Sequence, residues 1–142
     1  MASVRAMDCP FCAIVAGSLE ASVVHEDEHV LAFMDLHPLA TGHLLVVPKA
    51  HAASLADLDP DDGARVFRVA HRLAGAVRAS SVRTDGINLF LADGEAAGQE
   101  VFHVHLHVLP RHPDDGFRLQ VSPTEPTRAE LDAVAAEITG TR

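Results

Sequence analysis

The sequence predicts an α+β domain that combines a largely antiparallel sheet with one long helix and a C-terminal helix. The expected elements follow the order strand, strand, strand, helix, strand, strand, helix, which is typical of this class. The 142 residues, 48% of them hydrophobic, suffice for one core. Because the sequence contains no internal repeat, low-complexity block or linker, we expect a single domain over residues 1–142.

Short apolar runs bounded by turn residues predict three strands in the first third of the chain. Val23 to His25 and Val30 to Met34 are expected as strands on either side of the polar turn 26–28. Leu44 to Val47 is expected as a buried strand, since a glycine precedes it and a proline follows it. The sheet therefore begins here.

A long amphipathic helix is predicted from about Pro60 to Ala79. Asp59 can cap the first turn, Pro60 suits the first helical position, and two further aspartates complement the helix dipole. The spacing of apolar residues predicts one buried face, with a basic face in solvent. The expected buried residues are Val66, Phe67, Ala70, Leu73, Ala74 and Val77, and the expected outer residues are Arg65, Arg68 and Arg72.

Two more strands and a helix complete the predicted order. Residues 87–91 and Val101 to Leu109 are expected as strands joined by the turn-rich segment 92–98, and residues 110–126 have the composition of a loop. The last helix is predicted from about Arg128 to Ile138, with a capping box from Thr127 to Glu130 and a glycine stop.

Composition excludes several classes of function. The net charge of −9 disfavours binding to a nucleic-acid backbone, and no apolar run approaches a membrane span. The two cysteines, Cys9 and Cys12, are too close together to staple a secreted scaffold, so we expect a cytoplasmic protein with reduced thiols. Ten histidines, against no Trp and no Tyr, indicate chemistry rather than packing.

Three histidines alternate along one predicted strand. Alternation places His103, His105 and His107 on one face and the four apolar residues Phe102, Val104, Leu106 and Val108 on the other. One interpretation is an inert, histidine-rich surface. A second is a metal site for oxidation or hydrolysis, which would normally add a carboxylate that does not follow directly in the sequence. A third is covalent catalysis at phosphorus, in which a neutral imidazole attacks and its neighbours stabilise the phosphoryl charge.

The run HVHLHVLPR at residues 103–111 resembles the signature of the histidine triad (HIT) nucleotide hydrolases and transferases. DCPFCAI, FMDLHPLATGHLLVVPKAH and GQEVFHVHLHVLPR extend the likeness over about residues 8–117, the expected core, with the helix at about 127–139 outside it. The order is similar to small bacterial, zinc-binding members of the nucleoside phosphoramidase-like branch, which implies an α+β HIT-like fold and a homodimer. The resemblance also implies that His105 is the nucleophile that becomes nucleotidylated, that His107 contacts the phosphate, and that His43 and His103 support the site.

The two cysteines have the spacing of two ligands of a tetrahedral metal site. Two thiolates separated by two residues can reach one tetrahedral ion, but two more ligands are needed. The resemblance implies that His51 and His103 join Cys9 and Cys12 around a structural zinc. One alternative is a redox dithiol, although the sequence lacks the preceding strand that a thioredoxin-like site requires. The other is a pair of unrelated thiols.

A nucleotide pocket is also implied by the resemblance. Asp35 would accept hydrogen bonds from the ribose hydroxyls. Phe11, Ile14 and Leu36 would form the apolar walls for a purine, although Ile14 could equally be a core residue. The candidate nucleotide-binding residues are Asp35, Phe11, Ile14, Leu36, Asn88, Gln99, Glu100, His105 and His107.

Two positions depart from the family pattern. The phosphoramidase branch commonly carries Asn where this chain has Ala92, and Ser or Thr where it has Glu100. A carboxylate near a phosphate repels it unless it engages a cation. The sequence therefore favours a substrate or leaving group that presents an amine or cation to Glu100.

The expected activity is hydrolysis of nucleoside phosphoramidates or related phosphoanhydrides, by nucleotidyl transfer to water. Hydrolysis of dinucleoside polyphosphates is the adjacent alternative, because it shares the triad and differs in the leaving group. A nucleotide sensor without turnover is the non-enzymatic alternative, and a metal-dependent oxidase or hydrolase is the third.

Overall fold

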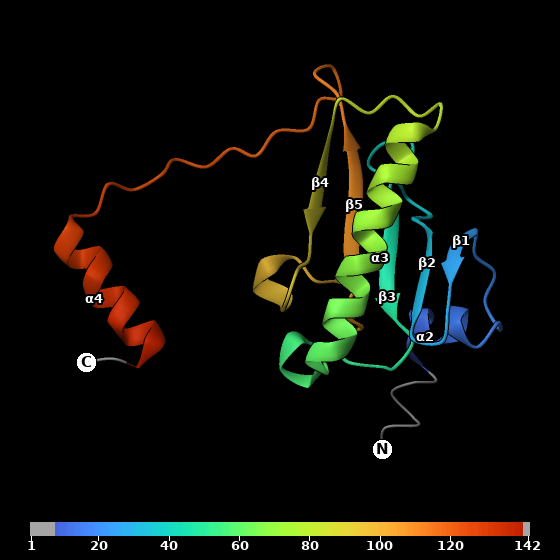
Figure 1. The fold of residues 1–142 in the computed structure, drawn as a ribbon, viewed down its shortest axis with the longest axis horizontal. Helices are drawn as coiled ribbons and strands as arrows, with labels where there is room; N and C mark the ends of the chain where they lie inside the picture. The colour runs from blue at the N-terminus through green and yellow to red at the C-terminus, as the bar shows by residue number, and fades with distance from the viewer. Residues whose placement is uncertain (1–7, 141–142) are drawn as a thin grey trace.

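The computed structural model describes residues 8–140 and confirms the predicted α+β class. Five strands form one antiparallel sheet in the order β1-β2-β3-β5-β4 (Figure 1). The strands are β1 (Val23–Glu26), β2 (Val30–Met34), β3 (Leu44–Pro48), β4 (Gly86–Phe90) and β5 (Leu106–Arg111). The helices are α2 (Pro10–Val15), α3 (Pro60–Ala79) and α4 (Arg128–Thr139), with short 3-10 turns at Leu55–Asp57 and Glu95–Ala97.

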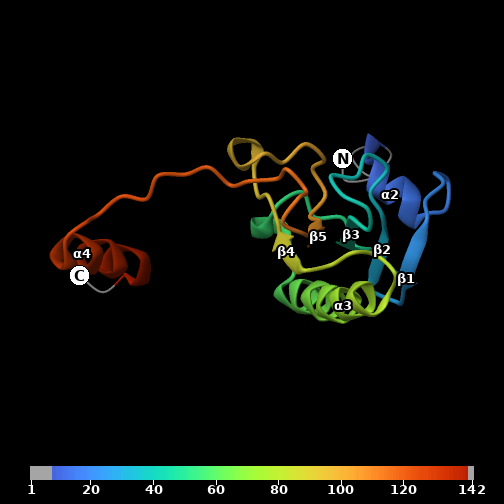
Figure 2. The same cartoon turned by 90° about the horizontal axis from the view of Figure 1, so that it is seen from above.

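The sheet is covered differently on its two faces. The long helix α3 lies across one face, and the short helix α2 lies on the opposite side (Figure 2). Among the described residues, no helix is long and apolar enough to cross a membrane. Since α2 is short, it leaves part of its face open, and the candidate site lies there.

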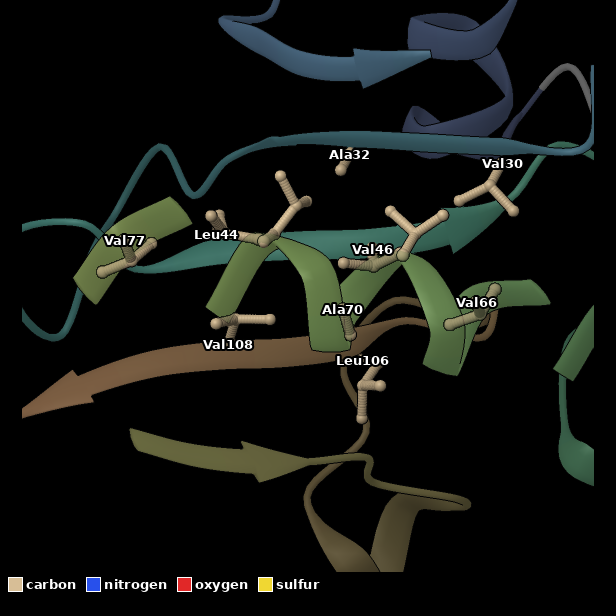
Figure 3. Packing of buried hydrophobic residues seen from close by; sticks show 11 residues of the cluster. Val30, Ala32, Leu44, Val46, Val66, Ala70, Val77, Leu106 and Val108 are labelled. Carbon is tan, nitrogen blue, oxygen red and sulfur yellow. The ribbon is translucent and has the colours of Figure 1, made fainter. Parts of the chain in front are cut away.

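The main core lies between α3 and the sheet (Figure 3). The helix begins as predicted, because the Asp59 carboxylate accepts a hydrogen bond from the amide of Asp61. Its buried stripe differs in one respect from the prediction: Phe67 is 57% exposed, and Val69 is buried instead. Phe67 follows Val66 directly, so its side chain is rotated by about 100° around the helix axis from the buried stripe. Val69 lies three residues after Val66 and four before Leu73, and therefore belongs to that stripe. The core residues are Val30, Ala32, Leu44, Val46, Val66, Val69, Ala70, Leu73, Val77, Leu106 and Val108.

A second, smaller cluster lies beneath α2. It was not anticipated from the sequence, because six residues are too few to show a helical period. Pro10 occupies the first turn of α2, and Cys9 caps it by accepting a hydrogen bond from the Cys12 amide at 3.3 Å. The cluster comprises Cys9, Phe11, Leu31, Phe33, Leu45 and Val47.

The histidine segment is only partly a strand, which corrects the predicted strand Val101 to Leu109. The strand β5 starts at Leu106, and residues 101–105 are irregular. Two backbone carbonyls in this segment accept hydrogen bonds from side chains instead of from a neighbouring strand. The Gln99 amide donates to the Val101 carbonyl, and Nδ1–H of His105 donates to the His103 carbonyl. Phe102 consequently leaves the predicted apolar face and is 50% exposed.

The C-terminal helix forms as predicted but lies apart from the sheet. Both bonds of the capping box are present, since the Thr127 hydroxyl accepts from the Glu130 amide and the Glu130 carboxylate accepts from the Thr127 amide. Gly140 adopts a positive φ of 73° and ends the helix. Figure 1 shows α4 beyond the edge strand β4, at the end of an extended segment.

Candidate active site

A cavity of about 880 Å³ opens on the α2 side of the sheet. Its floor is formed by β2, β3 and β5, and its walls come from α2, the segment that follows β2 and the irregular segment that precedes β5. A volume of this size accommodates a nucleotide. Eight of the predicted site residues line it: Phe11, Ile14, Asp35, Leu36, His43, Glu100, His105 and His107.

The ring of His105 is held by the backbone. Its Nδ1 lies 2.8 Å from the His103 carbonyl oxygen, which can only accept a hydrogen bond. In the neutral imidazole the proton is therefore on Nδ1, and Nε2 carries the lone pair. The edge of Phe11 packs at 5.1 Å between ring centroids and keeps the imidazole buried. His105 is thus held in a fixed orientation at the wall of the cavity.

A second chain of hydrogen bonds orients His107. The Leu39 amide donates to Nδ1 of His43 at 3.1 Å, so the proton of His43 resides on Nε2. That Nε2–H donates to Nδ1 of His107 at 2.9 Å, which leaves the proton of His107 on its own Nε2. The two neighbouring rings are therefore held in opposite roles: His105 offers a lone pair and His107 offers an N–H.

The surroundings keep the supporting histidines neutral. Burial, and then repulsion from His105 and His43, lowers the pKa of His107 to about 4. Burial also lowers the pKa of His43, although the nearby Asp35 carboxylate opposes this shift. Asp35 lies 3.6 Å from Nε2 of His43 and accepts a hydrogen bond from the His37 amide. At neutral pH, His43 and His107 are therefore neutral imidazoles rather than imidazolium ions.

The sequence analysis missed Phe90, which stacks on His107. The two rings are 4.1 Å apart and inclined by 7°. Phe90 pairs with His107 across β4 and β5, so only the strand register could have revealed the contact. The stack fixes the plane of the imidazole from the side away from His43.

Two predicted nucleotide-binding residues lie outside the cavity lining. The buried Gln99 amide is fully occupied: its oxygen accepts from the Gly94 amide, and its nitrogen donates to the Ala53 and Val101 carbonyls. The Asn88 side chain accepts a hydrogen bond from Arg111. We therefore leave both residues out of the site.

The lining is acidic for a cavity that would take a phosphate. Glu20, Asp35 and Glu100 contribute carboxylates, whereas none of the described lining residues is Lys or Arg. Ala92 does not belong to the lining. Positive counter-charge for a substrate is thus absent from the side chains around the described cavity.

Four potential metal ligands converge next to the irregular segment that precedes β5. The ligand atoms of Cys9, Cys12, His51 and His103 all lie within 4.8 Å of one another. Nδ1 of His103 is 3.4 Å from the Cys9 sulfur and 3.2 Å from Nδ1 of His51, and the Cys12 sulfur is 3.2 Å from Nδ1 of His51. Ligands around a tetrahedral zinc are about 3.3 to 3.8 Å apart, so the set fits such an ion.

The protonation state of this cluster also suits a metal. The Nε2–H of His103 donates to the Pro48 carbonyl at 2.8 Å, so the lone pair on Nδ1 faces the two sulfurs. Both cysteines are free thiols, and burial together with the neighbouring Cys9 raises the pKa of Cys12 to about 11. A bound cation would displace the thiol protons. The His103 carbonyl that orients His105 belongs to one of these ligands.

The fold and the site together define an α+β protein with a histidine-lined cavity on one face of its sheet, and the comparison with known families shows which family this is. The model of the HIT domain matches residues 16–114. The chain therefore belongs to the HIT family.

Individual relatives support this assignment. The chain is 47% identical over 111 residues to an uncharacterized HIT-like protein of Borreliella burgdorferi, which covers 78% of this chain and 80% of that protein. It is similar to the crystal structure of a HIT family protein from Bacillus anthracis, with a TM-score of 0.88 and 38% identity over 95% of this chain and 97% of the other. It also resembles a Zn-bound histidine triad family protein from Mycobacterium smegmatis, with a TM-score of 0.77 and 40% identity over 96% of this chain and 99% of the other.

Proposed function

We propose that the protein is a nucleotide hydrolase that transfers a nucleotidyl group to water through a covalent intermediate on His105. The observation that carries this proposal is the tautomer of His105, because the bond from Nδ1–H to the His103 carbonyl leaves Nε2 with a free lone pair at the cavity wall. The substrate class is nucleoside phosphoramidates or related nucleotide phosphoanhydrides.

The reaction proceeds in two displacements. In the first, the lone pair on Nε2 of His105 forms a bond to the α-phosphorus, and the bond from phosphorus to the leaving nitrogen or oxygen breaks with its electron pair. The leaving atom takes up a proton from solvent. In the second, water attacks the same phosphorus and releases a proton to solvent, while the bond to Nε2 breaks, its electron pair returns to Nε2, and a nucleoside monophosphate leaves. The Nε2–H of His107 donates to a phosphoryl oxygen and stabilises the developing charge.

The remainder of the cavity suits the nucleoside. Phe11 and Ile14 offer an apolar wall for a purine, and Leu36, which is 87% exposed, gains cover when a base lies against it. The Asp35 carboxylate has its second oxygen available for ribose hydroxyls, since Oδ1 already accepts from the His37 amide.

Zinc is the ion that we propose for the cluster of Cys9, Cys12, His51 and His103. The two-sulfur, two-nitrogen donor set is typical of structural zinc sites, and a relative has been solved with Zn bound. Zinc would supply a crosslink between α2 and the segment before β5. The chemical step is carried by the imidazoles.

The cellular setting follows from the same residues. Two free thiols suit a reducing compartment, so we expect a cytoplasmic protein. We also expect a homodimer, as the family resemblance implies, with a purine nucleotide as the substrate and no nucleic-acid or membrane partner.

Turnover of two substrate types tests the proposal. Purified protein is mixed with an adenosine phosphoramidate and, separately, with a diadenosine polyphosphate, and release of AMP is measured. Wild type and His71→Ala, a variant of an exposed histidine on α3, should release AMP, whereas His105→Ala should not. Tight AMP binding by the wild type without turnover of either substrate would instead indicate a nucleotide sensor.

The acidic lining favours a cationic leaving group. Glu100 and Glu20 line the cavity, and none of the described lining residues carries a fixed positive charge. An amine or cation on the substrate would supply it. Glu100→Ser should lower kcat/KM for a phosphoramidate with a cationic side chain and leave an uncharged analogue unaffected. Equal activity of the two proteins on every cationic substrate tested would contradict this assignment.

A further inference from the structure

The cysteine pair, Cys9 and Cys12, can react with itself as well as hold a metal. These are the two cysteines of the sequence, and both are free thiols. Cys9 caps α2, Cys12 lies three residues later, and the Cys12 amide donates to the Cys9 sulfur at 3.3 Å. The two sulfurs lie within 4.8 Å of each other. The pair is therefore close enough to form a disulfide once its side chains turn toward each other.

The two sulfurs differ in their access to solvent. Cys9 is 6% exposed and belongs to the smaller core cluster, whereas Cys12 is half-buried and packs against the border of that cluster. The Cys12 sulfur contacts Nδ1 of His51 at 3.2 Å, and His51 is exposed. A small oxidant therefore reaches Cys12 first, with Cys9 behind it. This is the arrangement of an attacking cysteine and a resolving cysteine.

A disulfide tightens the first turn of α2, and Phe11 lies inside that turn. Residues three apart in a helix have Cβ atoms about 5–6 Å apart, whereas a disulfide brings them to about 3.8 Å. The Phe11 ring packs edge-on against His103 and His105, at 5.9 and 5.1 Å between ring centroids. Closure of the disulfide thus moves a side chain that packs on His105.

His103 provides a second connection between the cysteine pair and the cavity. Its Nδ1 lies 3.4 Å from the Cys9 sulfur and 3.5 Å from the Cys12 sulfur. Its carbonyl accepts the Nδ1–H of His105 at 2.8 Å. A disulfide offers no thiolate to a metal, so oxidation removes two of the four ligands that surround a cation here. The His103 ring then keeps its bond to the Pro48 carbonyl but loses its partners on the sulfur side.

We propose that Cys9 and Cys12 are a thiol-oxidation site for peroxides, at which disulfide formation removes both sulfur ligands and loosens the segment 101–105. This goes beyond the structural role proposed for the metal cluster, because the cluster then responds to oxidant. In a reducing compartment, thiol exchange reverses the disulfide, so the response is transient. The oxidation site rests on the geometry of the cluster, and only its effect on turnover rests on the proposed function.

The oxidation proceeds in two balanced steps. The Cys12 thiolate attacks one oxygen of hydrogen peroxide, the O–O bond breaks, and hydroxide leaves with the electron pair, which gives a sulfenic acid on Cys12. The Cys9 thiolate then attacks the Cys12 sulfur, the S–O bond breaks, and a second hydroxide leaves as the disulfide forms. The two protons of the original thiols convert both hydroxides to water. In total, two thiols and one hydrogen peroxide give one disulfide and two waters.

The test uses the full-length protein, loaded with zinc and then exposed to hydrogen peroxide. Free thiols, intact mass and released zinc are measured before oxidation, after oxidation, and after dithiothreitol is added with zinc. Hydrogen exchange is measured at the Val104 amide, which donates to the Ala52 carbonyl at 2.8 Å. This bond joins the residues that follow His51 and His103, so it reports on the segment that carries His105.

Oxidised wild type should lose both thiols, about 2 Da of mass and its zinc. Its Val104 amide should exchange at least about tenfold faster, because the segment opens more often. Dithiothreitol with zinc should restore all four values. The matched variant is Cys12→His, which keeps a metal-binding side chain but leaves Cys9 without a second thiol. It should keep its mass, its zinc and its exchange rate at the same peroxide dose.

Retention of both thiols and zinc by wild type, at a peroxide dose that oxidises free glutathione, would overturn the proposal. The same holds for addition of oxygen to the cysteines without a disulfide, for a disulfide that leaves exchange at Val104 unchanged, and for loss of zinc from Cys12→His. AMP release should fall in parallel with the thiols and recover on reduction. A protein without any turnover would contradict the proposed function, while the other four readouts would still decide the oxidation site.

Discussion

At the scale of single residues, the site depends on where three protons reside. Backbone groups decide two of them: the His103 carbonyl accepts a hydrogen bond from Nδ1–H of His105, and the Leu39 amide forces the proton of His43 onto Nε2. His107 follows from His43. A ring with a free acceptor nitrogen and a ring with a free N–H thus result from identical neutral side chains, because each is bonded to a different neighbour.

Removing His43 should disturb catalysis more than binding. His43→Gln replaces the ring that orients His107, so kcat should fall by about 10²-fold while KM changes little. The control is His29→Gln, which alters a half-buried histidine outside the cavity lining. Steady-state kinetics of both variants check this, and an unchanged kcat for His43→Gln would remove His43 from the orienting chain.

Acid should destabilise the protein through the buried histidines. His107 titrates near 4 in the folded chain and near 6.5 when unfolded, so the unfolded state binds more protons between these values. Its contribution to the free energy of unfolding therefore falls as the pH drops from 6.5 to 4, by about 1.4 kcal/mol per pH unit. Urea unfolding of wild type at pH 7, 5.5 and 4.5 should show this loss. His107→Gln should show a shallower decline, and parallel declines would contradict the assignment.

At the scale of elements, the α3 core accounts for much of the stability. Leu73 is buried against the sheet, so Leu73→Ala should cost about 2–5 kcal/mol of unfolding free energy. Phe67→Ala lies on the same helix at a site where the side chain is largely exposed, and it should cost far less. Chemical denaturation of the two variants compares them directly. Equal losses of unfolding free energy in the two variants would indicate that Phe67 is a core residue.

The metal cluster should stabilise α2 and the segment before β5 together. Chelation should lower the Tm of wild-type protein, because the ion would bind only the folded set of ligands. Cys12→Ser should start at a lower Tm and respond little to chelator, whereas Ser81→Ala, which alters an exposed serine between α3 and β4, should behave as wild type. Metal analysis alongside the melting curves identifies the ion. Chelation without any shift in Tm in metal-loaded protein would contradict a structural role.

The elements also show how far sequence reasoning reaches. The capping signals of α3 and α4 are local, so their starts were predicted correctly. The boundary of β5 was wrong, because it depends on side-chain bonds from Gln99 and His105 to nearby carbonyls. The Phe90 stack depends on the β4–β5 register, and α2 is too short to have a period. A single sequence does not reveal which strands pair, in which register, or which side chains bond to distant backbone groups.

At the scale of the whole molecule, separate parts of one small fold have separate roles. The sheet and α3 provide a rigid floor, and the cluster of Cys9, Cys12, His51 and His103 lies beside the segment that leads into β5. The motif residues 103, 105 and 107 were predictable from their alternation. The cavity around them was not, since its lining comes from segments distant in the sequence.

The most direct measurement of the central claim is intact-mass analysis of the protein, quenched without acid shortly after mixing with an adenosine phosphoramidate. The account predicts an adenylyl adduct on the wild type, absent from His105→Ala and located by peptide mapping on His105. An adduct on another residue, or efficient AMP release by His105→Ala, would contradict it.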